Sequence, residues 1–398
     1  MNKIKLAIIT THPIQYYAPV FRKLHQSQTI TPRVFYTWSQ TESGDFYDRE
    51  FGVNVGWDVP LLTGYDYQFV RNTASKPGTH HFFGIRNPGL TEAITAWGAD
   101  AVLVYGWNKV SHLQALRYFK GRIPVFFRGD SNLLDPRSPL RNHLRRLFLS
   151  WIYRHVDVAI SVGENNRDYY RWLGMPDSHI AFAPHCINNE HFDDPHSRHQ
   201  HQANQWRSQL GIATTDLVIV FAGKLIPKKD PALLLKAFIK ANTTAHLVFF
   251  GNGELEAELR NMSGSNPRIH FMPFQNQSLM PAVYRTGDLF VLPSCGPGET
   301  WGLALNEAMA SHRPVIASSM AGGARDLVQS DQNGWVFTAG NVNQLSELIH
   351  AASLLGKEKL QEMGTNASIF IQNWSTDASA ASTADIVSRY CMEFSRTD

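Results

Sequence analysis

The stretch 288–318, DLFVLPSCGPGETWGLALNEAMASHRPVIAS, decides the fold class of this chain. Two short apolar runs, DLFVLPS and RPVIAS, enclose a glycine-bearing loop and a helix-like segment. Apolar runs of this length are typical of strands that are buried on both faces of a parallel sheet. The stretch therefore predicts a strand–helix–strand unit, in which ligands bind just beyond the end of the first strand.

The same alternation of strand-like and helix-like segments extends over most of the chain. It predicts strands at 5–10, 101–106, 123–129, 158–163, 217–223, 246–253, 268–274, 288–294, 313–318 and 334–337, and helices at 19–26, 111–120, 139–156, 165–174, 231–241 and 301–311. A chain of 398 residues has room for two domains of this kind. We therefore predict an α/β fold of two doubly wound, Rossmann-like domains that face each other across a cleft.

A polar segment divides the two halves of the chain. Residues 191–215 lack apolar periodicity in their first part, and we interpret them as a linker that leads into a short helix. Residues 1–190 then form an N-terminal domain, and residues 216–375 form a C-terminal domain.

Composition argues against several classes of protein. The chain has 37 Lys and Arg against 34 Asp and Glu, which does not indicate the concentrated basic face of a nucleic-acid-binding protein. Its three cysteines form no CxxC pair, so a reduced, cytoplasmic compartment is favoured. No run approaches the roughly 20 apolar residues of a membrane-spanning helix. We therefore expect neither a nucleic-acid partner nor a membrane span.

Two carboxylates follow the strand 288–294. Glu299 lies in the loop and Glu307 lies eight residues later, in the helix-like segment. The start of a helix binds anions, and carboxylates accept short, strong hydrogen bonds from sugar and ribose hydroxyls. The pattern thus suits a phosphorylated sugar, and the alternative is two solvated glutamates, one of them near a helix start.

A basic turn follows the strand 217–223. Lys224, Lys228 and Lys229 crowd together before Pro231, which favours the first position of a helix. Three lysines at the end of a strand can neutralise a diphosphate. The alternative is an exposed basic turn without a ligand.

Together these stretches resemble the family 4 retaining glycosyltransferases, which have the GT-B fold. That family has an E-x7-E motif after a strand that ends in Pro-Ser, and Glu299 and Glu307 match it here. It also has a G-R-x-x-x-x-K turn, in which Lys229 matches and Lys224 stands where arginine is usual. The segment PVIASSMAGGARDLV resembles a further motif of the family, with Asp326 for the usual glutamate.

The resemblance implies a role for each matching residue. Glu307 would accept hydrogen bonds from the nucleotide ribose, Glu299 would accept them from the donor sugar, and Lys224 and Lys229 would stabilise the departing diphosphate. The C-terminal helix, 376–398, is expected to cross back to the first domain. The full set of expected donor-binding residues is Glu307, Gly298, Thr300, Trp301, Gly302, Leu303, Gly223, Gly251 and Phe274.

We expect no metal ion and no cofactor, because the nucleotide-sugar is itself a co-substrate. Metal-dependent glycosyltransferases hold a cation with an Asp-x-Asp triplet, and the chain contains none. Lysines and a helix start can take the place of the cation.

The acceptor side of the site is less strongly indicated. Arg128 and Asp130 follow the strand 123–129, where many family members carry a histidine. Arg128 suits an anionic acceptor group and Asp130 suits the proton of an acceptor hydroxyl; the alternative is a structural Arg–Asp pair.

The segment after the first strand is a second candidate for acceptor binding. His12, Gln15 and Tyr16 follow that strand, although a lone histidine is more often structural. The aromatic and polar segment 38–58 is a candidate acceptor loop or an ordered surface insertion.

The helix-like segment 139–156 combines arginines with an apolar stripe. A basic amphipathic helix can lie on an anionic membrane, at the inner face of which a lipid-linked acceptor would be found. An apolar stripe is also typical of a helix that faces the core, which is the interpretation we favour.

The resemblance implies a retaining hexosyltransferase, and the absence of an Asp-x-Asp triplet favours one that is metal-independent. It would move a sugar from a nucleotide-diphosphate donor to a hydroxyl of a glycan or lipid-linked acceptor, in surface polysaccharide biosynthesis. A sugar-nucleotide 2-epimerase of the same architecture is one alternative. A non-catalytic subunit that binds nucleotide-sugar is another.

Overall fold

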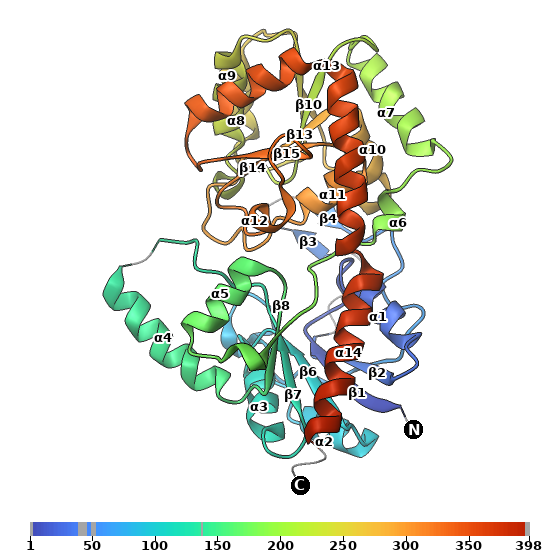
Figure 1. The fold of residues 1–398 in the computed structure, drawn as a ribbon, viewed down its shortest axis with the longest axis vertical. Helices are drawn as coiled ribbons and strands as arrows, with labels where there is room; N and C mark the ends of the chain where they lie inside the picture. The colour runs from blue at the N-terminus through green and yellow to red at the C-terminus, as the bar shows by residue number, and fades with distance from the viewer. Residues whose placement is uncertain (1–2, 39–45, 49–52, 137, 395–398) are drawn as a thin grey trace. The chain divides into compact units, whose positions relative to one another are not determined.

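The computed structural model describes residues 3–38, 46–48, 53–136 and 138–394 (Figure 1). The chain divides into two compact units. Unit 1 consists of Met1–Phe46, Val59–His185 and Thr376–Asp398, and unit 2 consists of Tyr47–Asp58 and Cys186–Ser375. Each unit is built on its own parallel sheet, so the prediction of two doubly wound α/β units is confirmed.

Unit 1 contains, among the described residues, a seven-stranded parallel sheet in the order β5-β2-β1-β6-β7-β8-β9. The chain runs outward from β1 to β2 and β5, and then returns to place β6 on the other side of β1. The strand order therefore reverses between β1 and β6. The strands are β1 (Ile4–Thr10), β2 (Ile30–Tyr36), β5 (Tyr67–Phe69), β6 (Ala101–Tyr105), β7 (Val125–Arg128), β8 (Val158–Ser161) and β9 (Ile180–Phe182).

Helices of unit 1 cover this sheet. They are α1 (Ala18–His25), α2 (Leu90–Trp97), α3 (Val110–Phe119), α4 (Pro139–Tyr153), α5 (Glu164–Trp172) and α14 (Thr376–Phe394). The last of these, at the C-terminal end of the chain, packs beside α1 (Figure 1). Lys23 and Asp377 form an ion pair between the two helices, with 2.9 Å between Nζ and Oδ1.

Unit 2 contains, in the part of the chain that the structure describes, a six-stranded parallel sheet in the order β12-β11-β10-β13-β14-β15. Its strands are β10 (Val218–Ala222), β11 (His246–Phe250), β12 (Ile269–Met272), β13 (Leu289–Leu292), β14 (Val315–Ser318) and β15 (Gly334–Phe337). Its helices are α6 (Asn189–Phe192), α7 (Arg198–Gln209), α8 (Pro231–Ala241), α9 (Glu256–Ser263), α10 (Met280–Thr286), α11 (Ala304–Ala310), α12 (Ala324–Leu327) and α13 (Val342–Ile371).

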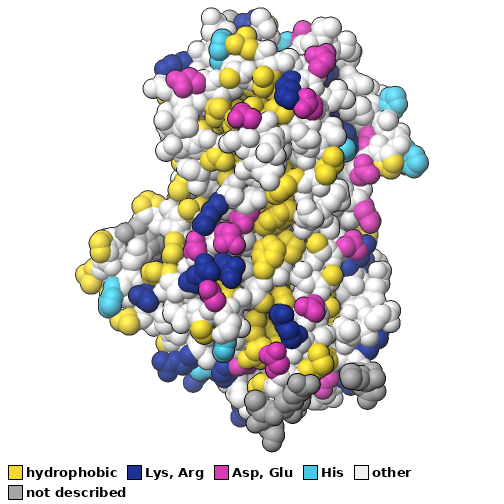
Figure 2. All heavy atoms as spheres, viewed as in Figure 1, with side chains coloured by type: hydrophobic (Ala, Val, Ile, Leu, Met, Phe, Trp, Pro, Cys, Tyr) yellow, Lys and Arg dark blue, Asp and Glu magenta, His cyan; other side chains and the backbone are white. Residues whose placement is uncertain are grey.

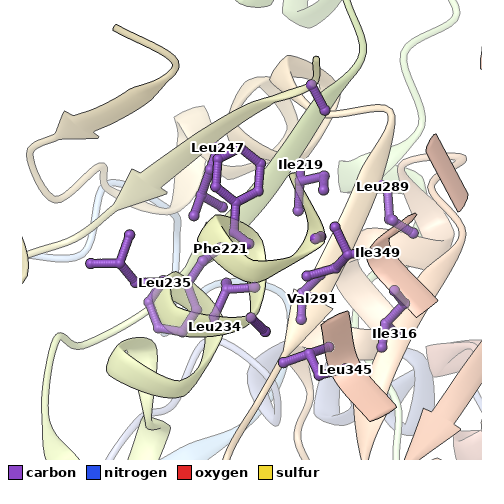
Figure 3. Close-up of a cluster of buried hydrophobic side chains, with 14 of the residues drawn as sticks. Ile219, Phe221, Leu234, Leu235, Leu247, Leu289, Val291, Ile316, Leu345 and Ile349 are labelled. Atoms are coloured by element: carbon purple, nitrogen blue, oxygen red, sulfur yellow. The ribbon is translucent and has the colours of Figure 1, made fainter. Parts of the chain in front are cut away.

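The core of unit 2 anchors the strands from which the site loops arise. Side chains of β10, β11, β13 and β14 pack against α8 and α13 (Figure 3). Ile219, Phe221, Leu289 and Val291 are fully buried in this cluster. Burial on this scale holds the ends of β10 and β13 in a fixed relation, because well-packed interiors resist small displacements.

Two segments lie differently from the domain boundaries expected above. Residues 191–215 belong to unit 2 and contain α7, which packs on α10 and buries Ala203 and Trp206. Residues 47–58 also belong to unit 2, where Asn276 Nδ2 donates to the Gly56 carbonyl over 2.5 Å. Of the candidate acceptor loop 38–58, residues 39–45 and 49–52 lie outside the described residues.

The apolar stripe of α4 is not the core-facing one that we favoured. Leu149, Ile152 and Tyr153 are buried, but they lie on the opposite side of the helix from a second apolar strip, which is exposed. Apolar residues that recur every three or four positions predict an apolar face on a helix. They do not determine which face the rest of the chain covers.

Candidate functional site

The candidate site of unit 2 lies where the strand order of its sheet reverses. β10 and β13 are neighbours, but the chain passes through β11 and β12 between them. In open α/β sheets, ligands bind at such a reversal, beyond the carboxyl ends of the strands. The loop 223–229 follows β10 and the loop 293–303 follows β13. The N–H of Cys295 donates to the Lys228 carbonyl over 3.1 Å, which joins the two loops.

Lys229 and Glu299 connect the same two loops through their side chains. Lys229 Nζ donates to Glu299 Oε2 over 2.6 Å, and Ser294 Oγ donates to the same oxygen over 3.0 Å. Glu299 is only 7% exposed, so its carboxylate is held in one place. Lys229 ends the short turn η4 (Pro227–Lys229), just before α8 begins. The pair therefore places a cation and a carboxylate together at the strand-order reversal.

Glu307 is held from the other side of the loop. It is 3% exposed, and Tyr284 OH donates to its Oε2 over 2.6 Å. Gln277 Nε2 donates to its Oε1 over 3.4 Å. Neither partner was expected from the sequence, because Gln277 and Tyr284 reach Glu307 only through the packing of η5 (Gln277–Leu279) and α10 against α11.

The helix after the site loop begins later than the sequence suggested. A helix was expected from Trp301, whereas α11 begins at Ala304. Gly302 has φ +90°, a left-handed conformation that a right-handed helix does not contain. Glu307 is consequently the fourth residue of α11, closer to the helix start than the expected helix would place it.

Trp301 anchors the site loop by its side chain. The ring is buried, its Nε1 donates to Asn306 Oδ1 over 2.9 Å, and it lies against Trp374 with 5.2 Å between ring centroids. Gly323 lies directly under the ring, where a Cβ would come within 2.8 Å of it. The backbone amide of Trp301, rather than its indole ring, is therefore the candidate for contact with a ligand. Thr300 and Leu303, on either side in the loop, are half-buried.

Glycines let the loops after β10 and β11 approach closely. Gly223 has φ +152° and Gly251 has φ +138°, and a Cβ on Gly251 would lie 2.0 Å from the Gly223 carbonyl oxygen. Asn252 accepts a hydrogen bond from the Phe274 amide over 2.8 Å, which brings the loop after β12 to the same edge. Lys224 and Phe274 are half-buried at this edge of the sheet. A Cβ on Gly298, in the loop after β13, would lie 3.8 Å from Lys228 Nζ.

In unit 1, Arg128 forms hydrogen bonds with backbone carbonyls. Its two terminal nitrogens donate to the carbonyls of Ala183 and Pro184, over 3.0 and 2.9 Å, and the residue is almost fully buried. These contacts favour a structural role over the anion-binding role expected for it. Asp130 is half-buried, and its charge acts on the buried His185, which the sequence did not single out.

His12 follows β1, beside the reversal of strand order in unit 1. Its Nδ1 lies 2.9 Å from Thr11 Oγ1, and its ring meets the edge of Trp38 at 5.8 Å. Burial lowers the pKa of His12 from 6.5 to about 4, so the imidazole is neutral at neutral pH. Gln15 and Tyr16 are half-buried in the turn that follows.

The described residues provide neither a cluster of metal-binding side chains nor a membrane-spanning helix. Within 3–38, 46–48, 53–136 and 138–394, no three His, Cys, Asp or Glu side chains are gathered as a metal site. Over these same ranges, no helix has both the length and the apolar character to traverse a bilayer.

Known proteins are similar to this chain in two ways. Residues 202–369 match the family model described as Glycosyl transferases group 1. An uncharacterized glycosyltransferase, MJ1607, of Methanocaldococcus jannaschii is 30% identical over 138 residues, which are 33% of this chain and 35% of that protein. The sulfoquinovosyl transferase SQD2 of Arabidopsis thaliana is 31% identical over 155 residues, 36% of this chain and 29% of that protein. The chain thus spans about a third of the length of these relatives.

The structural similarity covers nearly the whole chain. Crystal structures of Anabaena Alr3699/HepE in complex with UDP, and with UDP and glucose, superpose with TM-scores of 0.72 and 0.69. Both are 18% identical and cover 97% of this chain and 100% of that one, a level of identity that establishes the fold alone. Residues 202–369 are therefore similar to the Glycosyl transferases group 1 family, within a chain that has the GT-B fold.

Proposed function

We propose that this chain is a retaining glycosyltransferase. It moves a hexosyl unit from a nucleotide-diphosphate sugar to a hydroxyl of a glycan or lipid-linked acceptor, in surface polysaccharide biosynthesis. The observation that carries the proposal is the Lys229–Glu299 pair beside the buried Glu307, at the strand-order reversal of unit 2. The group 1 match of the same segment and the nucleotide named in the Anabaena complexes support it.

Each residue has a chemical task in the proposed reaction. The ribose hydroxyls of the donor donate to Glu307, which Tyr284 and Gln277 orient. Lys229 and Lys224 counter the negative charge that grows on the diphosphate as the bond from the sugar carbon to phosphate oxygen breaks. A new bond forms from that carbon to the acceptor oxygen. Because the new bond forms on the face from which the diphosphate departs, the configuration is retained, and the acceptor proton passes to a diphosphate oxygen on that face.

The proposed reaction uses no metal ion. Lysine side chains beside the diphosphate supply positive charge where other enzymes place a divalent cation. Lys224 offers a point charge in place of the two-pronged guanidinium usual at that position, so it neutralises the phosphate but orients it less.

A thermal-shift screen of UDP-, GDP- and ADP-sugars, with and without EDTA, tests the donor site. We expect one nucleotide to raise the melting temperature, regardless of EDTA, because a ligand that binds only the folded state stabilises it. The rise should disappear in Glu307→Ala. It should persist in Glu362→Ala, which removes an exposed glutamate of the same unit.

The screen also separates the alternatives. If no nucleotide-sugar shifts the melting temperature of the wild-type chain, the donor site is misassigned. If a donor binds but no acceptor ever receives its sugar, and the bound donor is not slowly hydrolysed, the chain is a binding subunit. The hydrogen bonds from Arg128 to the carbonyls of Ala183 and Pro184 favour this second function, because they give a candidate catalytic residue a structural role.

A further inference from the structure

The helix α4 carries a strip of exposed apolar side chains in addition to its buried side. The strip consists of Leu140, Leu144, Leu147, Phe148 and Trp151, and we call it the α4 face. Their exposed fractions run from 36% for Trp151 to 70% for Leu140. In Figure 2, yellow side chains gather on the lobe that α4 forms at the left of the view.

The spacing of these residues makes one continuous strip. Positions 140, 144, 147, 148 and 151 recur every three or four residues, so they share one side of the helix. The strip extends over about 16 Å of the helix axis, at 1.5 Å per residue. Phe148 and Trp151 stack at 6.3 Å, and Trp107 meets Phe148 at 5.8 Å, which extends the apolar surface onto the neighbouring loop. Contiguous exposed apolar strips are uncommon on monomeric proteins and mark binding surfaces.

The charges around the α4 face are basic. Residues 139–153 contain three arginines and a histidine, and no aspartate or glutamate. Arg141 and Arg146 are exposed, and Arg154 follows directly after the helix. Arg117 of α3 lies over the ring of Trp151, 5.8 Å from its centroid. Arg145 instead points to the body of the unit, over the rings of Tyr169 and Trp172.

We propose that the α4 face docks on the surface of an anionic lipid membrane. A helix with a polar, arginine-bearing side and exposed Leu, Phe and Trp lies in the plane of the headgroups, where the apolar side chains enter the acyl boundary. The aliphatic stems of the arginines allow their guanidinium groups to reach the phosphates of the lipid headgroups. Aromatic rings such as that of Trp151 favour this boundary, because one end of the ring is apolar and the other is polar.

The charge distribution disfavours a second copy of the chain as the occupant. Pairing two α4 faces would bring the arginines of both copies together, and α4 has no acidic residue to offset them. An anionic lipid surface instead complements the arginines. The proposal is independent of the proposed transfer reaction, although a lipid-linked acceptor would be met at the same surface.

Sedimentation with vesicles tests the proposal on the full chain. We expect the wild-type chain to sediment with vesicles of phosphatidylglycerol and phosphatidylcholine, and at least fivefold less with phosphatidylcholine alone. The double variant Leu144→Glu, Leu147→Glu should bind the anionic vesicles at least fivefold less than wild type. Arg141→Gln with Arg146→Gln should lose most of the preference for anionic lipid.

The matched control is Leu354→Glu with Ile369→Glu. Both residues are exposed apolar side chains of α13 in unit 2, and this variant changes the net charge by the same amount. It should sediment like wild type. The proposal is overturned if the wild-type chain does not bind anionic vesicles. It is also overturned if the α4 double variant and the α13 control variant bind these vesicles equally well. It is also overturned if light scattering shows a dimer that only the α4 variant dissociates, because the face would then join copies of the chain.

Discussion

Lys229 and Glu299 show how two residues that lie 70 positions apart acquire a shared role. Each comes from a loop at the end of its own strand, and the pairing of β10 with β13 brings the loops together. The carboxylate oxygen that accepts from Lys229 also accepts from Ser294, so both charges are satisfied before any ligand arrives. A charge-assisted bond of 2.6 Å is a strong one, and its loss leaves the partner partly buried without compensation.

We expect Lys229→Gln and Glu299→Gln each to lower the rate of sugar transfer at least a hundredfold. The first removes the positive charge that stabilises the leaving diphosphate, and the second replaces one carboxylate oxygen, an acceptor for donor hydroxyls, by an amide nitrogen that cannot accept. Each should cost about 1–3 kcal/mol of stability, because one buried partner loses its hydrogen bond. Transfer rates with the donor from the thermal-shift screen, and urea unfolding followed by circular dichroism, measure the two effects.

Lys228→Gln is the matched control for this prediction. The side chain is in the same turn and half-buried, but it lies outside the Lys229–Glu299 pair. It should lower transfer by less than tenfold. Equal losses at 228 and 229 would show that the turn contributes only diffuse positive charge.

At the scale of single residues, the sequence singled out the charged residues that the candidate site brings together, but not the residues that support them. Glu299, Glu307 and Lys229 follow strands and belong to a recognisable spacing. Tyr284 and Gln277 belong to no such pattern, and their contact with Glu307 depends on how separate elements pack. Periodicity along one segment carries no information about that packing.

At the scale of elements, Gly302 marks the point at which the loop 293–303 turns into α11. The left-handed φ of this residue ends the loop and delays α11, so that Glu307 lies in the first turn of the helix. A Cβ at Gly302 would also lie 2.8 Å from Leu292 Cδ2, and Leu292 is itself buried. The site loop is therefore intolerant of any side chain at this position.

We expect Gly302→Ala to lower the stability of the chain by about 1–3 kcal/mol, through the left-handed φ and the contact with Leu292. It should also abolish the nucleotide-induced thermal shift, because the loop amides move. The matched control is Gly89→Ala, at φ −86° with no atom within 4 Å of the added Cβ. A wild-type shift in Gly302→Ala would show that the loop is adaptable and that its exact backbone path is not required.

The elements that the sequence did not predict have physical reasons in common. β5 and β9 are three-residue strands, too short for a period to be measured, and β2 carries Pro32 among polar residues. The helix α4 shows the reverse difficulty, since both of its sides are apolar and only the packed structure distinguishes the covered side from the exposed one.

At the scale of the whole molecule, strand–helix alternation was sufficient for the class of fold but not for the order of the strands. Alternation requires parallel pairing, because each helix returns the chain to the same end of the sheet. It leaves open where the order reverses, and that reversal is what brings the loops after β10 and β13 together. The inclusion of 47–58 in unit 2 was likewise unforeseen, since it rests on single hydrogen bonds such as that from Asn276 to Gly56.

Buried histidines couple the stability of unit 1 to pH. Burial lowers the pKa of His12, His112 and His185 from 6.5 to about 4. His112 shows the cause most clearly, because it is only 1% exposed and burial lowers its pKa although the Gly106 carbonyl, 2.8 Å from its Nδ1, acts in the opposite direction. Burial therefore outweighs the carbonyl and favours the neutral ring, with the proton on Nδ1 facing the Gly106 carbonyl.

Between about pH 4 and pH 6.5, these histidines are protonated in the unfolded chain but mostly neutral in the folded chain. The free energy of unfolding therefore rises with pH over this window. The stabilisation is fully present above the ordinary histidine pKa and is lost as the pH falls. We expect unfolding at pH 5.5 to cost less than at pH 7.5 by about 1 kcal/mol for each of these histidines. Urea midpoints at several pH values measure the slope, and His112→Gln should reduce it by up to one proton. A midpoint that does not change from pH 7.5 to pH 5.5 would mean that these rings accept protons without leaving the folded state.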